Sequence, residues 1–359
     1  MKKGILLLVS ILVITTSCFA AKKSWLEQAN ESIKSNAYSK IDSMLVYHKN
    51  SLIFESYYGR FNENTLHRTH STFKSINGLL ALIAFDQKIL QANEFVLPLL
   101  KRFGEPKALD SRKKLLRVEH LLDMTSGLDC DEAPGGVGPS HEWGVDEGPT
   151  PFEYSLNIRM KNKPGASWHY CSANSFLLAA VISAALERAN RENIFEFAHR
   201  YLFAPLEIEK NNYRLRTSHD GQFLMGQGNS NFKSKDLAKF GLVVLNKGIW
   251  RGKRIVSEAS INELYQANEK INWSWTDEIP EHPASQTLYG NQWYQTTFEV
   301  KGEKVTSLHS WGNGGQFIFV VPKLEAVVVF TGSNQGNIKR QKQPFDIMYR
   351  YVLPDLMSR

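Results

Sequence analysis

The sequence of 359 residues predicts an α/β (α+β) fold, in which one sheet takes strands from both ends of the chain and helices fill the middle. Two apolar segments near the start, 44–47 and 52–58, flank Lys49-Asn50, as expected for a β-hairpin. Further strand-like segments come late in the chain, at 292–300, 304–308, 316–321 and 326–330. Because helical patterns separate the two groups, we expect a sheet unit that is split around a helical unit.

Apolar residues at helical spacing predict the helices that lie around and between these strands. The longest pattern covers 71–90, and a shorter one at 24–35 precedes the first strand. Further helices are expected at 118–124, 175–189, 194–202, 235–245 and 344–353. A loop rich in Pro and Gly, 134–151, carries Trp143, and loops of this length are often functional.

The first 20 residues have the pattern of an export signal. Lys2 and Lys3 precede an apolar run from Ile5 to Ile14, and small residues follow up to Ala20. The sequence therefore predicts a signal peptide at 1–20 and a periplasmic or secreted protein. An alternative makes Cys18 a lipoprotein cysteine, but the Leu-like residue that such sites carry three places upstream is missing. No later segment is long and apolar enough to cross a membrane.

Composition excludes several classes of protein. Hydrophobic residues make up 42% and charged residues 22%, which indicates a folded chain with a sizeable core. The net charge of +7 is mild and its basic residues are scattered, so we expect no nucleic-acid partner. His67 and His70 lack the Glu and the spacing of a zinc helix, and the P-loop pattern is absent. We therefore expect no metal and no cofactor.

A Ser-x-x-Lys motif is the first candidate for chemistry. A serine at a helix N-terminus lies near the positive end of the helix dipole, and a lysine three residues on shares its face. Such a lysine can take the hydroxyl proton. The spacing occurs at Ser71/Lys74, Ser111/Lys114 and Ser230/Lys233, but only Ser71 opens a long apolar helix. The alternative for Ser71 is an ordinary N-cap.

Two further segments contain residues that suit catalysis. Tyr170-Cys171-Ser172 precedes an apolar helix, and a phenol beside an amine can pass a proton to a leaving group. The segment 311–316 (Trp-Gly-Asn-Gly-Gly-Gln) opens a strand, where glycines let the backbone approach a ligand and an N–H can help to form an oxyanion hole. The alternatives are a structural tyrosine and a tight turn.

The order of these segments resembles that of the serine β-lactamase and penicillin-binding-protein superfamily. The stretch 70–75 (His-Ser-Thr-Phe-Lys-Ser) resembles its active-site helix, most closely in the class C branch with its esterases, D-aminopeptidases and aminohexanoate-oligomer hydrolases. Further matches occur, in order, at 118–128, 164–165, 170–172, 235–241, 289–293 and 312–316. The resemblance implies a β-lactamase/transpeptidase-like fold, with an antiparallel sheet flanked by helices plus an all-α insert. It implies a single catalytic domain over 21–359, with a sheet subdomain (about 24–70 and 225–359) and a helical subdomain (about 71–224).

The resemblance also implies roles for individual residues. Ser71 is the acylated nucleophile, and Lys74 and Tyr170 are the proton-transfer pair. The backbone N–H of Ser71 and one from the Asn313 region form the oxyanion hole. The residues expected to bind the oxyanion or the substrate are Ser172, Trp311, Gly312, Asn313 and Gly314.

Two departures from the family pattern bear on the substrate. Ser172 stands where members commonly have Asn, and Asn174 is out of register. The third motif reads Ser310-Trp311-Gly312 instead of Lys-Thr-Gly, with His309 one position off a His-x-Gly match. No cation is therefore placed to hold a β-lactam carboxylate, and we expect a small-molecule or peptide-like ester or amide substrate. The alternatives are a peptidoglycan D,D-carboxypeptidase, an endopeptidase or a β-lactamase, and, from another class, a non-catalytic receptor or scaffold.

Cys130 and Cys171 are the cysteines left after the predicted signal. In an oxidising compartment they form either a disulfide or two small buried hydrophobic residues. Cysteines at these two positions often occur together in the resembled family. With this resemblance, a disulfide and two buried free cysteines are equally expected.

Overall fold

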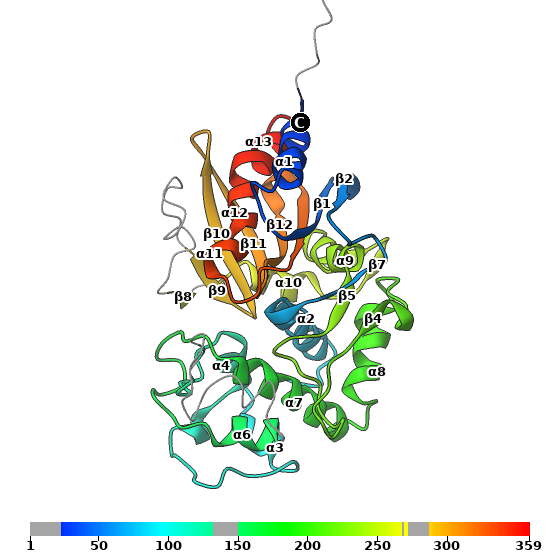
Figure 1. Ribbon diagram of the computed structural model, residues 1–359. Coiled ribbons are helices and arrows are strands. Elements are labelled where there is room, and N and C mark those ends of the chain that lie inside the picture. Colours follow the sequence, from blue (N-terminus) through cyan, green and yellow to red (C-terminus); the bar gives the residue numbers. More distant parts are fainter. Residues whose placement is uncertain (1–22, 131, 133–149, 268, 272–286) are drawn as a thin grey trace, which may run out of the picture.

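The computed structural model describes residues 23–130, 132, 150–267, 269–271 and 287–359. The predicted signal peptide and the loop around Trp143 lie outside the described residues. Figure 1 shows a sheet with helices on both sides, above a region built from helices of the middle of the chain. Among the described residues, no helix combines the length and the apolar character needed to cross a bilayer.

The large sheet takes strands from both ends of the chain. Eight strands in the described part lie in the order β2-β1-β13-β12-β11-β10-β9-β8, with antiparallel pairing throughout. Their bounds are β1 Ile41–His48, β2 Ser51–Tyr57, β8 Glu269–Lys270, β9 Thr287–Gly290, β10 Trp293–Val300, β11 Glu303–Gly312, β12 Gln316–Val321 and β13 Ala326–Gly332. The predicted α/β (α+β) class and the sheet built from both chain ends are confirmed.

The β1–β2 hairpin turns at Lys49 and Asn50, as predicted. Both residues have left-handed backbone, with φ of 49° and 64°. This geometry matches the right-handed twist of the flanking strands.

Helices cover both faces of the sheet, because side chains alternate along each strand. On β12, Phe317 and Phe319 face one cluster, which also holds residues of α1 Trp25–Lys34 and of the C-terminal helices. Ile318 and Val320 face the opposite cluster, with α9 Ser234–Leu245. The C-terminal helices are α11 Ile338–Gln341, α12 Gln343–Ile347, a π-helical turn at 348–352 and α13 Leu353–Leu356.

The helical region is built around α7 Ser172–Arg188, most of whose residues are buried. Helix α2, Phe73–Asp86, packs against α7 and also reaches the sheet at β10 and β11. Around them lie α3 Val96–Leu100, α4 Val118–Leu122, α6 Pro151–Asn157 and α8 Ile194–Ala198, while α10 Glu258–Leu264 packs on α2. Helix α2 therefore lies where the sheet and the helical region meet.

Several element boundaries differ from the predictions. Helix α2 ends at Asp86 and not at Leu90, because Lys88 takes a left-handed conformation (φ 56°) that stops the helix while the apolar pattern continues. Helix α7 begins at Ser172, three residues earlier than expected, since its first turn is buried but partly polar. A small sheet of β3 Leu66–Arg68, β5 Asn231–Lys233 and β4 Tyr213–Arg214, and the hairpin of β6 Ile249–Trp250 and β7 Lys253–Arg254, were not predicted, because strands of two or three residues carry too little pattern.

Candidate active site

Ser71 lies in a turn of 3-10 helix, 70–72, that leads directly into α2. The preceding Thr69 is anchored on the Ser230 carbonyl, which accepts from its backbone N–H at 2.8 Å and from its hydroxyl at 2.7 Å. His70 has left-handed backbone (φ 46°), and a Cβ on Gly228 would lie 2.8 Å from its carbonyl oxygen. The small sheet and the Gly228 segment thus enclose the turn and fix the direction of Ser71. The side chain of Ser71 does not cap the helix, contrary to the alternative considered from the sequence.

Lys74 lies one helical turn after Ser71 and is buried, with 3% of its surface exposed. Its Nζ donates to Ser71 Oγ at 2.9 Å, to Ser172 Oγ at 3.1 Å and to the Gln227 carbonyl at 2.8 Å. Two of these three neighbours are hydroxyl groups, which can donate as well as accept. The amine is therefore placed to exchange a proton with Ser71.

Tyr170 completes the arrangement from the segment before α7. Its phenol interacts with Lys74 and Ser71, and Lys74 Nζ lies 5.0 Å from the centre of its ring. Burial raises the pKa of Tyr170. The charge of Lys74 and the interactions with Lys74 and Ser71 lower it, but they do not cancel the effect of burial. The phenol consequently holds its proton at neutral pH while touching both partners.

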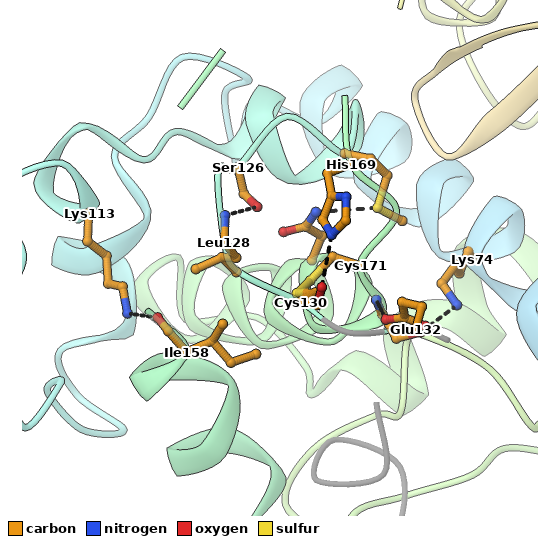
Figure 2. Close-up of a disulfide and its surroundings, with 12 residues drawn as sticks. Lys74, Lys113, Ser126, Leu128, Cys130, Glu132, Ile158, His169 and Cys171 are labelled. Atoms are coloured by element: carbon orange, nitrogen blue, oxygen red, sulfur yellow. Dashed lines mark hydrogen bonds between the residues drawn. A yellow bond between two sulfur atoms is a disulfide. The ribbon is translucent and has the colours of Figure 1, made fainter. Parts of the chain in front are cut away.

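A disulfide and a carboxylate lie beside Lys74 (Figure 2). Cys130 and Cys171 form a disulfide, with their Cα atoms 5.6 Å apart. Two residues after Cys130, Glu132 accepts from the Ser172 backbone N–H at 2.5 Å and from the Ser172 hydroxyl at 3.1 Å. His169 Nε2 lies 2.9 Å from the Cys130 carbonyl oxygen.

Glu132 and Gln227 contact the site, but the sequence did not single them out. Gln227 contributes its backbone carbonyl, which any residue carries, so its identity gives no signal. For Glu132, the disulfide was the available signal, because pairing Cys130 with Cys171 brings residue 132 close to Ser172.

The third motif lies against the Ser71 turn. Gly312 ends β11, and a Cβ there would lie 2.3 Å from the Thr69 carbonyl oxygen and 3.0 Å from the Thr72 nitrogen. Within the described residues, neither Ser71 nor Asn313 has an acceptor for its backbone N–H. Two N–H donors on adjacent segments suit an oxyanion hole.

The other predicted residues of this motif have different surroundings. The Gly314 N–H donates to Gln341 Oε1 at 3.3 Å and its carbonyl accepts from Asn334, so its main chain is already hydrogen-bonded. Gly314 has a φ of 94°, which explains a glycine at this turn. The side chain of Trp311 packs on Tyr294 and Phe317, on the same side of the sheet as His309.

The two residues that were out of register with the family motifs, Asn174 and His309, have contacts elsewhere in the core. Asn174 is fully buried and its Nδ2 lies 3.3 Å from the Met124 sulfur. His309 is fully buried between the rings of Tyr294 and Phe345. Burial lowers the pKa of His309 to about 3, so it is neutral and cannot replace the missing cation.

The comparisons with known proteins agree with this geometry. Residues 41–347 match the Beta-lactamase family, which is most of the chain. The chain belongs to the Beta-lactamase family. The resemblance stated from the sequence motifs is thereby confirmed.

Individual relatives are distant in sequence. A 6-aminohexanoate-dimer hydrolase of Paenarthrobacter ureafaciens is 23% identical over 298 residues, which cover 80% of this chain and 71% of the relative. The octameric penicillin-binding protein homologue from Pyrococcus abyssi is 16% identical, with a TM-score of 0.63 over 93% of this chain and 77% of that chain. EstCE1, a hydrolase with promiscuous acyltransferase activity, is 16% identical, with a TM-score of 0.64 over 90% of this chain and 97% of that chain. The two structures show the shared fold, and family and relatives together confirm a serine hydrolase of the esterase or amidase type.

The described residues offer no metal centre to this site. Among them, no group of three or more His, Cys, Asp or Glu side chains is arranged to hold a metal ion.

Proposed function

We propose that the chain is an exported serine hydrolase that cleaves an ester or an amide through a covalent acyl–Ser71 intermediate. One observation carries the proposal: a buried amine, Lys74 Nζ, lies 2.9 Å from Ser71 Oγ and 5.0 Å from the centre of the Tyr170 ring. This is the constellation of nucleophile, base and acid that covalent catalysis needs.

Acylation begins when Ser71 Oγ attacks the substrate carbonyl carbon. The hydroxyl proton passes to Lys74 Nζ, and the carbonyl oxygen becomes an oxyanion that accepts from the N–H groups of Ser71 and Asn313. The intermediate collapses with loss of the alcohol or amine, which takes the proton of Tyr170. Lys74 then returns a proton to the phenolate, leaving acyl–Ser71 and a neutral Lys74–Tyr170 pair.

Deacylation follows the same steps with water as the nucleophile. Water attacks the acyl carbon and gives its proton to the Lys74–Tyr170 pair. Ser71 leaves with a proton from the same pair, and the carboxylic acid departs. We assign the first proton acceptance to Lys74 and the leaving-group donation to Tyr170, because the raised pKa of Tyr170 keeps its proton on the oxygen.

The substrate class follows from the third motif. Ser310-Trp311-Gly312 supplies no cation beside the oxyanion hole, and His309 is buried and neutral. A β-lactam carboxylate has no partner there, whereas an uncharged ester or a linear amide needs none. The relative named for hydrolysing 6-aminohexanoate dimers supports the amide.

Export and domain organisation belong to the same proposal. The pattern of residues 1–20 suits a signal peptide, and a disulfide suits an oxidising compartment outside the cytoplasm. We propose that residues 21–359 form one catalytic domain with a sheet and a helical subdomain. Expression of the full chain with fractionation, and the N-terminal sequence of the exported product, test this part.

The direct test is hydrolysis of p-nitrophenyl butyrate by the mature protein and by Ser71→Ala. We expect turnover in the wild type and its loss in the variant. Ser111→Ala is a matched control, because Ser111 has the same Ser-x-x-Lys spacing but lies exposed in another part of the fold. Full activity in Ser71→Ala would contradict the proposal.

A peptidoglycan D,D-carboxypeptidase or endopeptidase is the second candidate. Export and the similarity to a penicillin-binding protein homologue favour it. Stable labelling of Ser71 by a fluorescent penicillin, together with release of D-alanine from a pentapeptide, would select this function. The intact Ser71, Lys74 and Tyr170 argue against a non-catalytic receptor, which needs no such trio.

A further inference from the structure

Glu132 holds Ser172 at two points, next to the proposed catalytic trio. One carboxylate oxygen accepts from the Ser172 backbone N–H at 2.5 Å and the other from the Ser172 hydroxyl at 3.1 Å. Ser172 is itself buried, with 4% of its surface exposed, and its oxygen lies 3.1 Å from Lys74 Nζ. Figure 2 shows Glu132 beside Lys74 and the disulfide.

The direction of the hydrogen bonds follows from the chemistry of the groups. An ionised carboxylate can only accept, so the Ser172 O–H points at Glu132. The lone pairs of Ser172 Oγ are then left for the N–H of Lys74. Ser71, Lys74, Ser172 and Glu132 thus form one chain of hydrogen bonds from nucleophile to carboxylate.

We propose that Glu132 is a positioning residue, which fixes the Ser172 hydroxyl so that Lys74 keeps an acceptor and a nearby negative charge when it takes the proton of Ser71. This inference rests on the proposed function, since it gives Glu132 a part in the same proton transfer. In this arrangement Glu132 orients the base, Lys74, through the hydroxyl of Ser172.

The charge of Glu132 reaches the site as well as its hydrogen bonds. It raises the pKa of Tyr170 and contributes to the raised pKa of Tyr294 behind it. Glu132 therefore favours the state that departure of the leaving group requires, a Tyr170 that still holds its proton.

The disulfide gives this pairing its rigidity. Glu132 follows Cys130 by two residues, and Ser172 follows Cys171 directly. The covalent link therefore joins the two backbone segments next to the two contacting side chains. Tyr170 precedes Cys171, so the same link also holds the proposed acid.

A purely structural role is the competing explanation. Ser172 is the first residue of α7, and a carboxylate that accepts from an N-terminal N–H stabilises a helix by itself. Such a role changes stability but leaves the pH dependence of catalysis unchanged. The two explanations therefore differ in the pH profile.

The test compares Glu132→Gln, Ser172→Ala, the double variant and Ser172→Thr, with Asp129→Asn as the control. Asp129 is an exposed acid in the same segment, 3.5 Å from Arg159, and its variant should behave as the wild type. For Glu132→Gln we expect kcat/KM on p-nitrophenyl butyrate to fall about 10- to 100-fold, mostly in kcat. We also expect the alkaline limb of kcat/KM to move to lower pH, because the phenol of Tyr170 loses a negative charge that raises its pKa. The other ionisable groups of this cluster, which include Lys74, Tyr170, Tyr289, Tyr294 and His169, are unchanged in the variant.

The double variant shows whether Glu132 acts through Ser172. We expect Glu132→Gln to cost little more once Ser172 is Ala, and Ser172→Thr to restore most of the activity because it keeps a hydroxyl. An unmoved alkaline limb in Glu132→Gln, or full additivity of the two losses, would overturn the proposal. If Glu132→Gln does not fold, Ser172→Ala carries the test with Ser172→Thr: the first leaves Glu132 in place and should show the same loss of kcat, and the second should restore it.

Wild-type acylation separates this inference from the proposed function. Butyrylation of Ser71 in the wild type, with the losses above, supports both. Butyrylation with a normal Glu132→Gln variant overturns only the role of Glu132. Absence of any acyl–Ser71 in the wild type overturns the proposed function, and the role of Glu132 with it.

Discussion

Gly312 and Thr69 touch across the gap between the sheet and the Ser71 turn. A Cβ atom on Gly312 would lie 2.3 Å from the carbonyl oxygen of Thr69, closer than any real contact. The neighbouring atom belongs to the backbone, so it cannot rotate away. The end of β11 and the turn that carries Ser71 are therefore held at a distance that only glycine permits.

Gly312→Ala should accordingly separate the oxyanion donors without unfolding the protein. A displacement of about 1 Å at a catalytic centre costs about 100-fold in rate, and we expect kcat/KM to fall by at least that factor. Steady-state kinetics with a circular dichroism spectrum of the variant check this. Gly302→Asn is the control, because Gly302 lies in a hairpin turn with open space around it and Asn tolerates its φ of 78°. Wild-type activity in Gly312→Ala would show that the close approach has no catalytic importance.

Tyr170→Phe should affect substrates according to their leaving groups. An amine or an alkoxide needs a proton to depart, whereas p-nitrophenolate leaves without one. We therefore expect a loss of about 100-fold or more on an amide, and a clearly smaller loss on p-nitrophenyl butyrate. The measurement is kcat/KM on both substrates with one enzyme preparation. Equal losses on the two would assign Tyr170 to activation of Ser71 instead of the leaving group.

Reduction of the Cys130–Cys171 disulfide should lower both stability and activity. The bridge closes a loop across 41 residues, and such a link contributes about 2–4 kcal/mol to the free energy of unfolding. Because it also joins the segments of Glu132 and Tyr170, we expect kcat to fall about 10-fold or more on reduction. Urea unfolding and activity with and without dithiothreitol test this, with thiol titration to prove reduction. The variant with Ser at both positions should resemble the reduced protein and ignore the reductant; unchanged kcat in fully reduced enzyme would contradict the prediction.

Asp42→Asn should stabilise the protein at high pH only. Burial raises the pKa of Asp42 to about 6, although the Ser333 hydroxyl donates to it. Because the pKa of Asp42 is higher in the folded than in the unfolded protein, proton binding stabilises the folded state. This stabilisation is fully present below pH 3.8, the pKa of the unfolded state, and is lost as the pH rises through about 6. The neutral amide avoids the cost of a buried charge, so the variant should gain about 1–2 kcal/mol at pH 8 and nothing near pH 4.

Urea unfolding of both proteins at the two pH values measures this difference. Burial lowers the pKa of the neighbouring His67 to about 4, so His67 is neutral at pH 8 and offers Asp42 no counter-charge. His67 is present in both proteins, so its own titration cancels to first order in the comparison. A destabilised variant at pH 8 would mean that the carboxylate is held by hydrogen bonds strong enough to outweigh its burial.

Local patterns were sufficient to predict much of the fold. The hairpin at Lys49-Asn50 and the strands of the last third were expected, because alternation and turn residues lie close together in the sequence. Ser71 and Lys74 are one helical turn apart, so their contact also follows from local geometry. That Tyr170 lies close to Ser71 and Lys74 was expected only from the order of the motifs, because Lys74 and Tyr170 are 96 positions apart in the sequence.

The rest of the site depends on tertiary contacts that local patterns do not encode. Gln227 supplies a main-chain carbonyl, and its side chain has no part in the bond to Lys74. Glu132 reaches Ser172 only because the chain folds the two cysteine segments together. The Gly314 main chain is hydrogen-bonded to Asn334 and Gln341, which follow β13 in the chain. Contacts of this kind between distant segments appear only once the fold is known.

The most direct test of the account is the covalent intermediate itself. Wild-type protein mixed with p-nitrophenyl butyrate and quenched in acid should gain the mass of one butyryl group, and peptide mapping should place it on Ser71. The burst of p-nitrophenol should equal the enzyme concentration, and Ser71→Ala should show neither the burst nor the mass. Turnover without any acyl group on Ser71, or an acyl group on another residue, would contradict the account.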